Sequence, residues 1–380
     1  MTEQVDAPPP QPVTVGVLRE TAPDESRVAL VPDDVGKLVE SGVSVIVEHD
    51  AGAGAFYSDG DYTAVGASTS TASDVVGGAE ILTVVRWPAQ PATLSTLRRG
   101  GIVVGFLDPS RNSEAIENLA TSGATVFAVE MIPRITRAQS MDALSSMSTI
   151  AGYRAVLLAA EASKRMFPML ITAAGTQPPC RVLVLGAGVA GLQALATAKR
   201  LGAITSGFDT RPEVREQVQS VGASFVQMEE DLQVEGTPGG YAQEVGEDFL
   251  KREQESIRPH VVSSDAVITT ALIPGKPAPV LITADMVSQM KPGAVIVDLA
   301  AEQGGNCELS KAGENVLAHG VTIVGPVNIP SQVATQASQM YSRNIATFVR
   351  LLMKDGAVVI DMEDEIIKGA CVAHAGEVSK

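Results

Sequence analysis

The chain has 380 residues, enough for two domains of ordinary size, and its 45% hydrophobic and 19% charged residues are typical of a globular protein. A formal net charge of −16 argues against a nucleic-acid partner, because phosphate binding needs a basic face. Aromatic residues are scarce at 4%, whereas 35 glycines favour buried parallel strands and close helix packing over aromatic binding platforms.

Residues 1–12 are acidic and rich in proline, and we expect a short disordered tail that lacks the basic and apolar regions of a signal peptide. Strands and helices then alternate, which predicts a parallel sheet with right-handed crossovers. A helix is expected at Asp33–Ser41, and the glycine-rich stretch 51–56 predicts a turn. The expected strands of this first series are Val13–Val17, Val43–Val47, Ile81–Val85, Ile102–Phe106 and Thr125–Ala128.

A second series of strands follows, and helical periodicity at 140–165 and 331–353 predicts a long helix on each side of it. We therefore predict an α/β fold of two Rossmann-like, doubly wound parallel-sheet domains joined by long helices, with the second inserted into the first. The first domain is expected at 1–137 and 330–380, and the second at 138–329. The expected strands of the second series are Arg181–Leu185, Ile204–Phe208, Ser224–Val226, Ala266–Thr270, Ala294–Asp298 and Thr322–Val324.

Three glycines form a dinucleotide-binding fingerprint between the strand Arg181–Leu185 and a helix expected at Leu192–Leu201. Gly186 allows a tight turn, Gly188 lets backbone N–H groups approach a pyrophosphate, and Gly191 lets the helix pack closely on the strand. The amides around Val189 and Ala190 would then lie at the positive end of the helix dipole.

Asp209 ends the next strand and can accept hydrogen bonds from both ribose hydroxyls while repelling a 2′-phosphate, which favours NAD(H) over NADP(H). Arg211, which follows Thr210, weakens this preference because an arginine can accommodate a 2′-phosphate, but NAD(H) stays the predicted cofactor, with Asp209, Thr210 and Arg211 at its ribose. After another strand, the backbone of Ala271 and Leu272 would border the adenosine, or would simply form a Pro-Gly loop.

The run PRITRAQSMDALSS, residues 133–146, places two arginines, an amide, a carboxylate and several hydroxyls upstream of the fingerprint. If it crosses an interdomain cleft, its side chains could bind the carboxamide and ribose of a nicotinamide. Ser140 as an N-cap with Asp142 in the first turn is the alternative, an ordinary helix start. That alternative does not account for Arg134, Arg137 and Gln139.

The carboxylate-rich segment from Gln227 to Pro259 is expected to be a long loop. It is either a solvated insertion or a mobile lid in which Tyr241 closes over the cofactor. Cys180, Cys307 and Cys371 are too widely spaced for a disulfide framework, and the four histidines are scattered, so no metal site is expected. No apolar run reaches the length of about 18 residues that spans a bilayer.

Several long strings together resemble the NAD(H)-binding domain I of proton-translocating nicotinamide nucleotide transhydrogenase. The resemblance extends from about Val13 to the end of the chain, which stops without transmembrane helices, as does the separate alpha-1 subunit of three-subunit bacterial enzymes. The strings are PRITRAQSMDALSS, GAGVAGLQALATAKRLGA, GGYAQEVGEDF, TTALIPGKPAPVLIT and DLAAEQGGNCELS.

The resemblance implies a Re/Si-specific NAD(P)+ transhydrogenase that is active only with partner subunits. Hydride would pass directly from NADH to NADP+ held on a separate domain, and membrane-spanning subunits would couple the transfer to proton movement. The chain is then expected to be a homodimer in the cytoplasm, peripheral on the inner face of the bacterial plasma membrane.

By the same resemblance, the nicotinamide end would be held by Arg134, Gln139, Asp142 and Ser145. The first three would be catalytic as positioning groups and not as a general acid or base. The pyrophosphate would lie at Gly188–Gly191, the adenosine ribose at Asp209, and Tyr241 on a mobile loop. Met147 departs from the pattern, since the family run often continues with glutamine.

Two alternatives stay open. Alanine dehydrogenase shares the strings RETAPDESRVALVP and GAGVAG, but the Lys and His of that family align with Val84 and Asp108. Arg27 matches a substrate-binding arginine of that family, but the Lys and His that act with it there would be missing. The second alternative is an NAD(H) sensor without turnover, which would share every cofactor motif.

Overall fold

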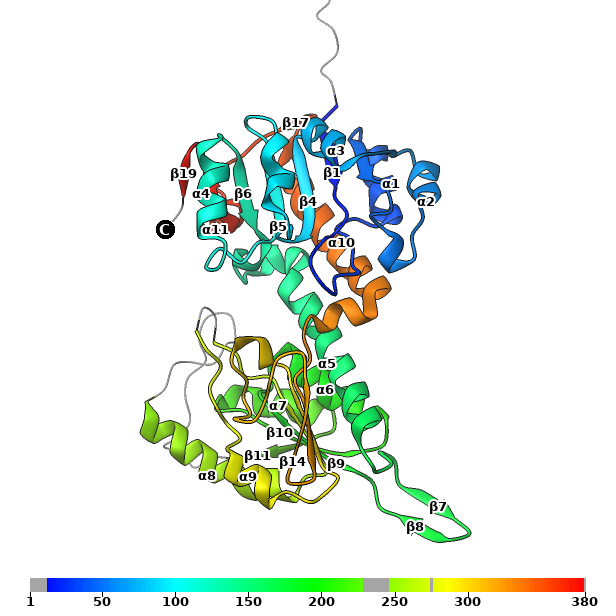
Figure 1. The fold of residues 1–380 in the computed structure, drawn as a ribbon, viewed down its shortest axis with the longest axis vertical. Coiled ribbons are helices and arrows are strands. Elements are labelled where there is room, and N and C mark those ends of the chain that lie inside the picture. The colour runs from blue at the N-terminus through cyan, green and yellow to red at the C-terminus, as the bar shows by residue number, and fades with distance from the viewer. Residues whose placement is uncertain (1–11, 228–245, 274–275, 379–380) are drawn as a thin grey trace, which may run out of the picture. The chain divides into compact units, whose positions relative to one another are not determined.

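The computed structural model describes residues 12–227, 246–273 and 276–378 (Figure 1). The chain folds into two compact units. Unit 1 comprises Met1–Ser146 with Ala334–Lys380, and unit 2 comprises Met147–Val333. The sequence-based boundaries at 137/138 and 329/330 remain a prediction.

Unit 1 is built on an eight-stranded sheet among its described residues, in the order β19-β18-β6-β5-β4-β1-β2-β3. The pairs from β6 to β3 are parallel, and β18 from the C-terminal segment adds antiparallel to β6. The strands are β1 (Thr14–Val17), β2 (Ser44–Glu48), β3 (Ser68–Ser70), β4 (Ile81–Arg86), β5 (Ile102–Phe106), β6 (Thr125–Ala128), β18 (Cys371–His374) and β19 (Glu377–Val378).

The returning helix α10 (Ala334–Leu351) fastens the C-terminal segment to unit 1. Its Tyr341 ring stacks on Phe106 with centroids 5.2 Å apart, and its Ser338 hydroxyl accepts from the Val28 amide at 3.0 Å. The other helices of unit 1 are α1 (Pro32–Glu40), α2 (Asp59–Ala64), α3 (Ala72–Gly78), α4 (Ser113–Thr121) and α11 (Glu365–Ala370), with 3-10 turns η1 (Ala53–Ala55), η2 (Pro91–Thr96), η3 (Val129–Met131) and η4 (Thr136–Met141) and the hairpin β16 (Met353–Lys354)–β17 (Ala357–Val358).

Unit 2 is built on a seven-stranded sheet in the order β11-β10-β9-β12-β13-β15-β14, with only β14 antiparallel among its described strands. Its strands are β9 (Arg181–Leu185), β10 (Ile204–Phe208), β11 (Ser224–Val226), β12 (Ala266–Thr269), β13 (Val295–Asp298), β14 (Asn315–Ala318) and β15 (Val321–Val324). The remaining elements are α5 (Ala143–Ala162), which begins in unit 1, α6 (Val189–Arg200), α7 (Arg215–Ser220), α8 (Glu247–Ser263), α9 (Ala284–Gln289), the turns η5 (Pro212–Val214), η7 (Ala301–Gln303) and η8 (Ile329–Val333), and the hairpin β7 (Leu170–Thr172)–β8 (Gly175–Gln177).

The predicted α/β fold with Rossmann-like parallel sheets is confirmed. Strand order reverses between β4 and β1 in unit 1 and between β9 and β12 in unit 2. In open α/β sheets, ligands bind at the carboxyl ends of the strands where the order reverses. The fold therefore marks one candidate crevice in each unit.

The prediction of a loop over residues 227–259 is wrong in its second half, because α8 occupies Glu247–Ser263. Glu253, Ile257 and Val261 recur every four residues and are the buried face of this helix. The many carboxylates concealed that period. Residues 228–245, with Tyr241 and the proposed lid, lie outside the described residues, as do residues 1–11 of the predicted tail.

Helix α5 corrects the expectation that no apolar segment could span a bilayer, since by length and composition it is long and apolar enough to do so. Its packing gives another reason for this composition. Ala155, Val156 and Ala159 are buried in the core of unit 2, and a Cβ added to Gly152 would lie 2.1 Å from the Ala190 carbonyl oxygen. Packing within unit 2 therefore accounts for part of the apolar composition of this helix.

Candidate functional site

The turn at residues 186–191, called the fingerprint turn below, connects β9 to α6. Gly186 has a φ of 94°, and a Cβ there would lie 2.5 Å from the Thr270 hydroxyl oxygen. A Cβ on Gly191 would lie 1.9 Å from the Gly186 carbonyl oxygen. Both positions therefore require glycine, and the absence of a side chain at Gly191 lets the helix pack directly against the turn.

Helix α6 begins at Val189, three residues earlier than predicted, and its N-terminus has the donors that an anionic ligand needs. Gly188 is the N-cap and provides no side-chain cap. The amides of Val189, Ala190 and Gly191 come before the first intrahelical donor, Leu192. A Cβ built on Gly188 would meet nothing within 4 Å, so space for a phosphate adjoins these amides.

Asp209, directly after β10, binds both the fingerprint turn and Arg211. Its carboxylate accepts from the Ala187 amide at 2.7 Å and from the Arg211 amide at 3.0 Å. Nε and Nη2 of Arg211 donate to its two oxygens at 2.9 and 3.0 Å. This pairing raises the pKa of the Arg211 guanidinium. Ribose hydroxyls must therefore share or replace the bonds of Arg211 to reach Asp209.

The loop after β12 is fixed against the same turn. The Thr270 hydroxyl donates to the Gly186 carbonyl at 3.1 Å. Asn306, which is fully buried, accepts from the Ala271 amide at 3.0 Å and donates to the carbonyls of Ala271 and Pro279, both at 2.8 Å. The position predicted to border the adenosine is thus held by an asparagine 35 residues later in the chain.

A second buried group, Asp298 at the end of β13, supports this loop. It accepts from the Thr269 hydroxyl at 2.8 Å and from the amides of Ala300 and Cys307 at 3.0 and 2.9 Å. The sequence pattern assigns no roles within the string DLAAEQGGNCELS. Its two fully buried polar side chains, Asp298 and Asn306, hold the loops that follow β12 and β13.

The run at residues 133–146 forms η4 and the start of α5. Gln139 and Ser140 are exposed, whereas Ala138 and Met141 are buried. The Asp142 carboxylate accepts from the Ser145 amide at 2.8 Å and from its hydroxyl at 2.6 Å. The expectation of Ser140 as the N-cap is wrong, because Asp142 caps α5.

Arg137, predicted to bind the cofactor, forms a bidentate ion pair with Asp364 at 2.6 and 2.8 Å. Arg137 lowers the pKa of Asp364 to about 2, and the pair joins η4 to α11. Arg134 is exposed on the loop before η4. The run belongs to unit 1 and the fingerprint turn to unit 2, so their assembly into one site stays a prediction.

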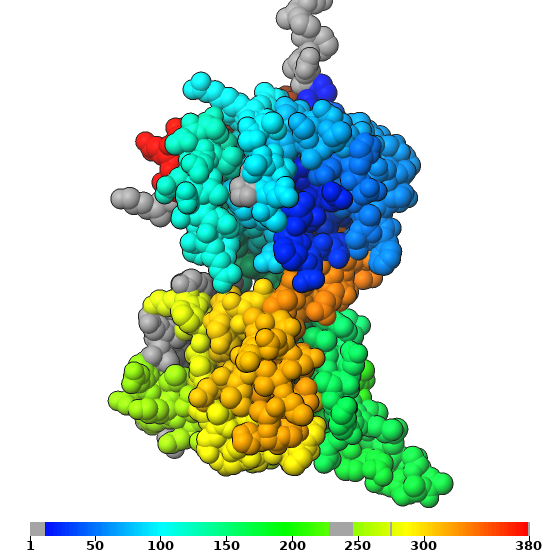
Figure 2. Space-filling model, in the orientation of Figure 1, coloured from blue at the N-terminus to red at the C-terminus, as the bar shows by residue number. Residues whose placement is uncertain are grey.

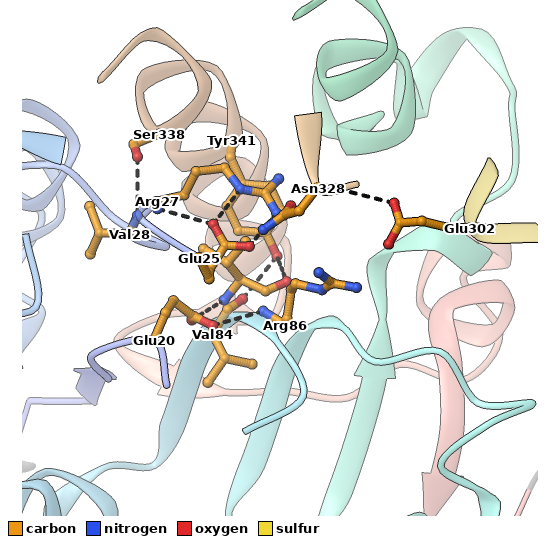
Figure 3. Close-up of polar contacts among 11 residues, drawn as sticks. Glu20, Glu25, Arg27, Val28, Val84, Arg86, Glu302, Asn328, Ser338 and Tyr341 are labelled. Atoms are coloured by element: carbon orange, nitrogen blue, oxygen red, sulfur yellow. Dashed lines mark hydrogen bonds and ion pairs between the residues drawn. The ribbon is translucent and has the colours of Figure 1, made fainter. Parts of the chain in front are cut away.

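Unit 1 carries a buried polar cluster at its own reversal of strand order (Figure 3). Arg27 binds Glu25 through Nε and Nη2 at 2.8 and 2.6 Å. Glu20, after β1, accepts from the Val85 and Arg86 amides, and burial raises its pKa to about 8. The hydroxyl of Tyr341 donates to the Val84 carbonyl at 2.9 Å.

The two positions where the alternative dehydrogenase needs Lys and His do not offer that chemistry. Val84 is buried inside β4, and Asp108 lies 3.5 Å from Arg111 in an exposed ion pair. Val84 has no ionisable group to replace the lysine. Asp108 has a carboxylate in place of the imidazole, which would meet the substrate carboxylate unfavourably.

The three cysteines are free and buried. Burial raises the pKa of Cys180 and of Cys307 to about 11, so these thiols stay protonated at neutral pH. Among the described residues no cluster of His, Cys, Asp and Glu could hold a metal ion.

Comparison with known proteins covers nearly the whole chain. Residues 16–151 match the family model described as alanine dehydrogenase/PNT, N-terminal domain, and residues 155–380 match its C-terminal counterpart. The chain is 47% identical over 372 residues to the first part of NAD(P) transhydrogenase subunit alpha of Rhodospirillum rubrum, covering 96% of this chain and 97% of that one. NAD(P) transhydrogenase subunit alpha of Cereibacter sphaeroides is 47% identical over 370 residues, 96% of this chain and 71% of its own length.

Solved structures of the same two kinds of protein have a similar fold. The crystal structure of transhydrogenase from Sinorhizobium meliloti superposes with a TM-score of 0.87 at 43% identity, over 96% of this chain and all of that chain. A structure of L-alanine dehydrogenase gives a TM-score of 0.81 at 27% identity, over 96% of both chains.

Replacing Asn306 with alanine tests the loop that it holds. Asn306→Ala leaves the backbone of Ala271 without its partners, so we expect a loss of about 1–3 kcal/mol in the free energy of unfolding and weaker NADH binding. Urea unfolding and calorimetric NADH titration measure both. Asn315→Ala, on the exposed edge strand β14, is the control. Unchanged NADH affinity in Asn306→Ala would show that this loop does not border the ligand.

The buried carboxyl group of Glu253 predicts how the free energy of unfolding depends on pH. Burial, and then the charge of Asp209, raise its pKa from 4.5 to about 7. The folded state therefore loses stability as pH rises from about 4.5 through 7, because the carboxyl ionises more readily in the unfolded chain. Glu253→Gln should gain about 3 kcal/mol over wild type between pH 4.5 and 8. Urea unfolding at both pH values checks this, and Glu255→Gln, exposed on the same helix, should show no such gain.

Proposed function

The chain belongs to the alanine dehydrogenase/PNT family, and we propose that it is the NAD(H)-binding subunit of a proton-translocating NAD(P) transhydrogenase. One contrast carries the proposal. Unit 2 has a glycine turn and a helix N-terminus of the kind that binds a pyrophosphate, whereas the two acid–base positions of an amino-acid dehydrogenase are occupied by Val84 and Asp108. A hydride-transfer partner that needs no protein acid or base fits that combination.

The fingerprint turn supports the cofactor assignment. Under this proposal the amides of Val189, Ala190 and Gly191 bind the pyrophosphate in the space beside Gly188. Asp209 receives the adenosine ribose hydroxyls, which replace part of its contact with Arg211, and Ala271 with Leu272 borders the adenosine. With Arg211 paired to Asp209, the site favours NAD(H), because a 2′-phosphate would lie against that carboxylate.

The nicotinamide end is assigned to Arg134, Gln139, Asp142 and Ser145. Bound NADH supplies the hydride, and NADP+ on a partner domain receives it. Transfer between two nicotinamide rings moves no proton to a side chain, so the protein has to hold the reacting carbons about 3–3.5 Å apart and exclude water. The Asp142–Ser145 contact keeps both side chains in one geometry for that task.

The partners follow from the same assignment. An NADP(H)-binding domain would dock where the nicotinamide is exposed, and membrane-spanning subunits would couple transfer to proton movement. The chain would then lie on the cytoplasmic face of the membrane, held there by those subunits.

We also propose a homodimer, on the evidence of the β7–β8 hairpin, which projects from unit 2 (Figures 1 and 2). The hairpin pairs with no other described strand and carries exposed apolar side chains, with Ile171 79% exposed and Met169 56% exposed. An isolated two-stranded sheet is marginal in water, and its open edges invite pairing. A second copy of the chain would cover it.

Asp142→Asn tests the positioning role. Asparagine can still cap α5, so stability should hold, but the charge facing Ser145 is lost. We expect the rate of NADH-to-NADP+ transfer, measured with an NADP(H)-binding transhydrogenase domain, to fall about 10–100-fold, equivalent to a charged hydrogen bond. NADH affinity should change by less than about threefold by comparison. Asp33→Asn, exposed on α1, is the control, and an unchanged rate in Asp142→Asn would remove this role.

Ile171→Asp tests the dimer. A carboxylate on a covered apolar hairpin costs desolvation, so we expect the dimer dissociation constant to rise at least about tenfold. Sedimentation velocity across a concentration series measures it. Leu317→Asp, 75% exposed on β14, is the matched control. If Ile171→Asp sediments like wild type, the hairpin is not the interface.

A further inference from the structure

Asn344 connects the returning helix α10 to the predicted nicotinamide-binding run. Its side chain is 8% exposed, and its Nδ2 donates to the Ser140 carbonyl at 2.8 Å. Ser140 lies in η4, next to Gln139 and two residues before Asp142. The contact joins residues 204 positions apart, both within unit 1.

A 3-10 turn is weakly held by its own hydrogen bonds, so outside contacts decide its geometry. Contacts of different kinds join η4 to other described residues of unit 1. Ala138 and Met141 are buried beneath it, Arg137 is paired with Asp364, and Asn344 holds the Ser140 carbonyl. Of these contacts, the hydrogen bond from Asn344 is the one made to the backbone between Gln139 and Asp142.

The oxygen of the same amide, Oδ1, is in an unfavourable position. Asn344 Oδ1 is buried and has no hydrogen-bond partner among the residues that the structure describes. Exchanging the amide's O and N would place an oxygen against the Ser140 carbonyl, so the orientation is fixed. A buried polar atom without a partner is unfavourable, and an apolar residue of similar size would avoid that cost. What the amide supplies at this position is its contact with the Ser140 carbonyl.

We propose that Asn344 is a positioning residue for hydride transfer: it fixes η4 so that Gln139 and Asp142 hold the nicotinamide in its reactive orientation. The proposal rests on the proposed function. It assigns Asn344 no contact with the cofactor and no proton transfer; the residue acts through the Ser140 backbone.

The test is a double-mutant cycle. Asn344→Leu removes the donor, and we expect the NADH-to-NADP+ transfer rate to fall about tenfold. Its thermal midpoint should stay close to that of wild type, because the Ser140 carbonyl loses its partner while the unpaired Oδ1 of Asn344 is removed. NADH affinity should change by less than about threefold. Asn344→Ser, which is too short to reach Ser140 but adds no bulk, should show the same loss of rate.

Combining Asn344→Leu with Asp142→Asn should lower the rate by clearly less than the product of the two single effects, since both act on one geometry. Ser338→Ala, which loses a buried backbone contact elsewhere on α10, should lower stability and leave the rate unchanged. Multiplicative effects, or rate losses that follow the thermal midpoint, would overturn the proposal. A wild-type chain that transfers no hydride with the partner domain would instead overturn the proposed function.

Discussion

The close approach of α6 to the turn after β9 is the constraint on which the rest of unit 2 depends. Gly191 permits it from one side, since a Cβ would lie 1.9 Å from the Gly186 carbonyl oxygen. Gly152 permits α5 to approach the same first turn of α6, where a Cβ would lie 2.1 Å from the Ala190 carbonyl oxygen. Together they fix a helix N-terminus, with its unpaired amides, beside the open space at Gly188.

Buried polar groups then hold the strand ends around that helix. Asp209 joins the ends of β9 and β10, Asn306 holds the loop after β12, and Asp298 connects β12 to β13. Each of these side chains has several hydrogen-bond partners, so contacts within unit 2 fix the loops at these strand ends. Loops fixed in this way suit a nucleotide site, because a rigid site loses less conformational entropy on binding.

The sequence predicted the fold well where local pattern decides structure. Ile102–Phe106, Arg181–Leu185 and Ile204–Phe208 have the predicted bounds, because buried parallel strands are short apolar runs between breakers. Helix α8 was missed because carboxylates concealed its four-residue period. The cap of α5 was misplaced by two residues, since Ser140 and Asp142 are both good caps. The roles of Asn306, Asn344 and Asp364 depend on partners 35 to 227 residues away, which no local pattern can reveal.

Hydride transfer between two nucleotides, without an amino-acid substrate, is the proposed activity that can be measured most directly. The measurement mixes the chain with an NADP(H)-binding transhydrogenase domain and follows the reduction of an NAD+ analogue by NADH, with and without NADP(H), beside a reaction of NAD+ with L-alanine. We expect reduction of the analogue only when NADP(H) and the partner domain are present, and none with alanine. Alanine-dependent NADH formation, or intact NADH binding without any transfer, would contradict this expectation.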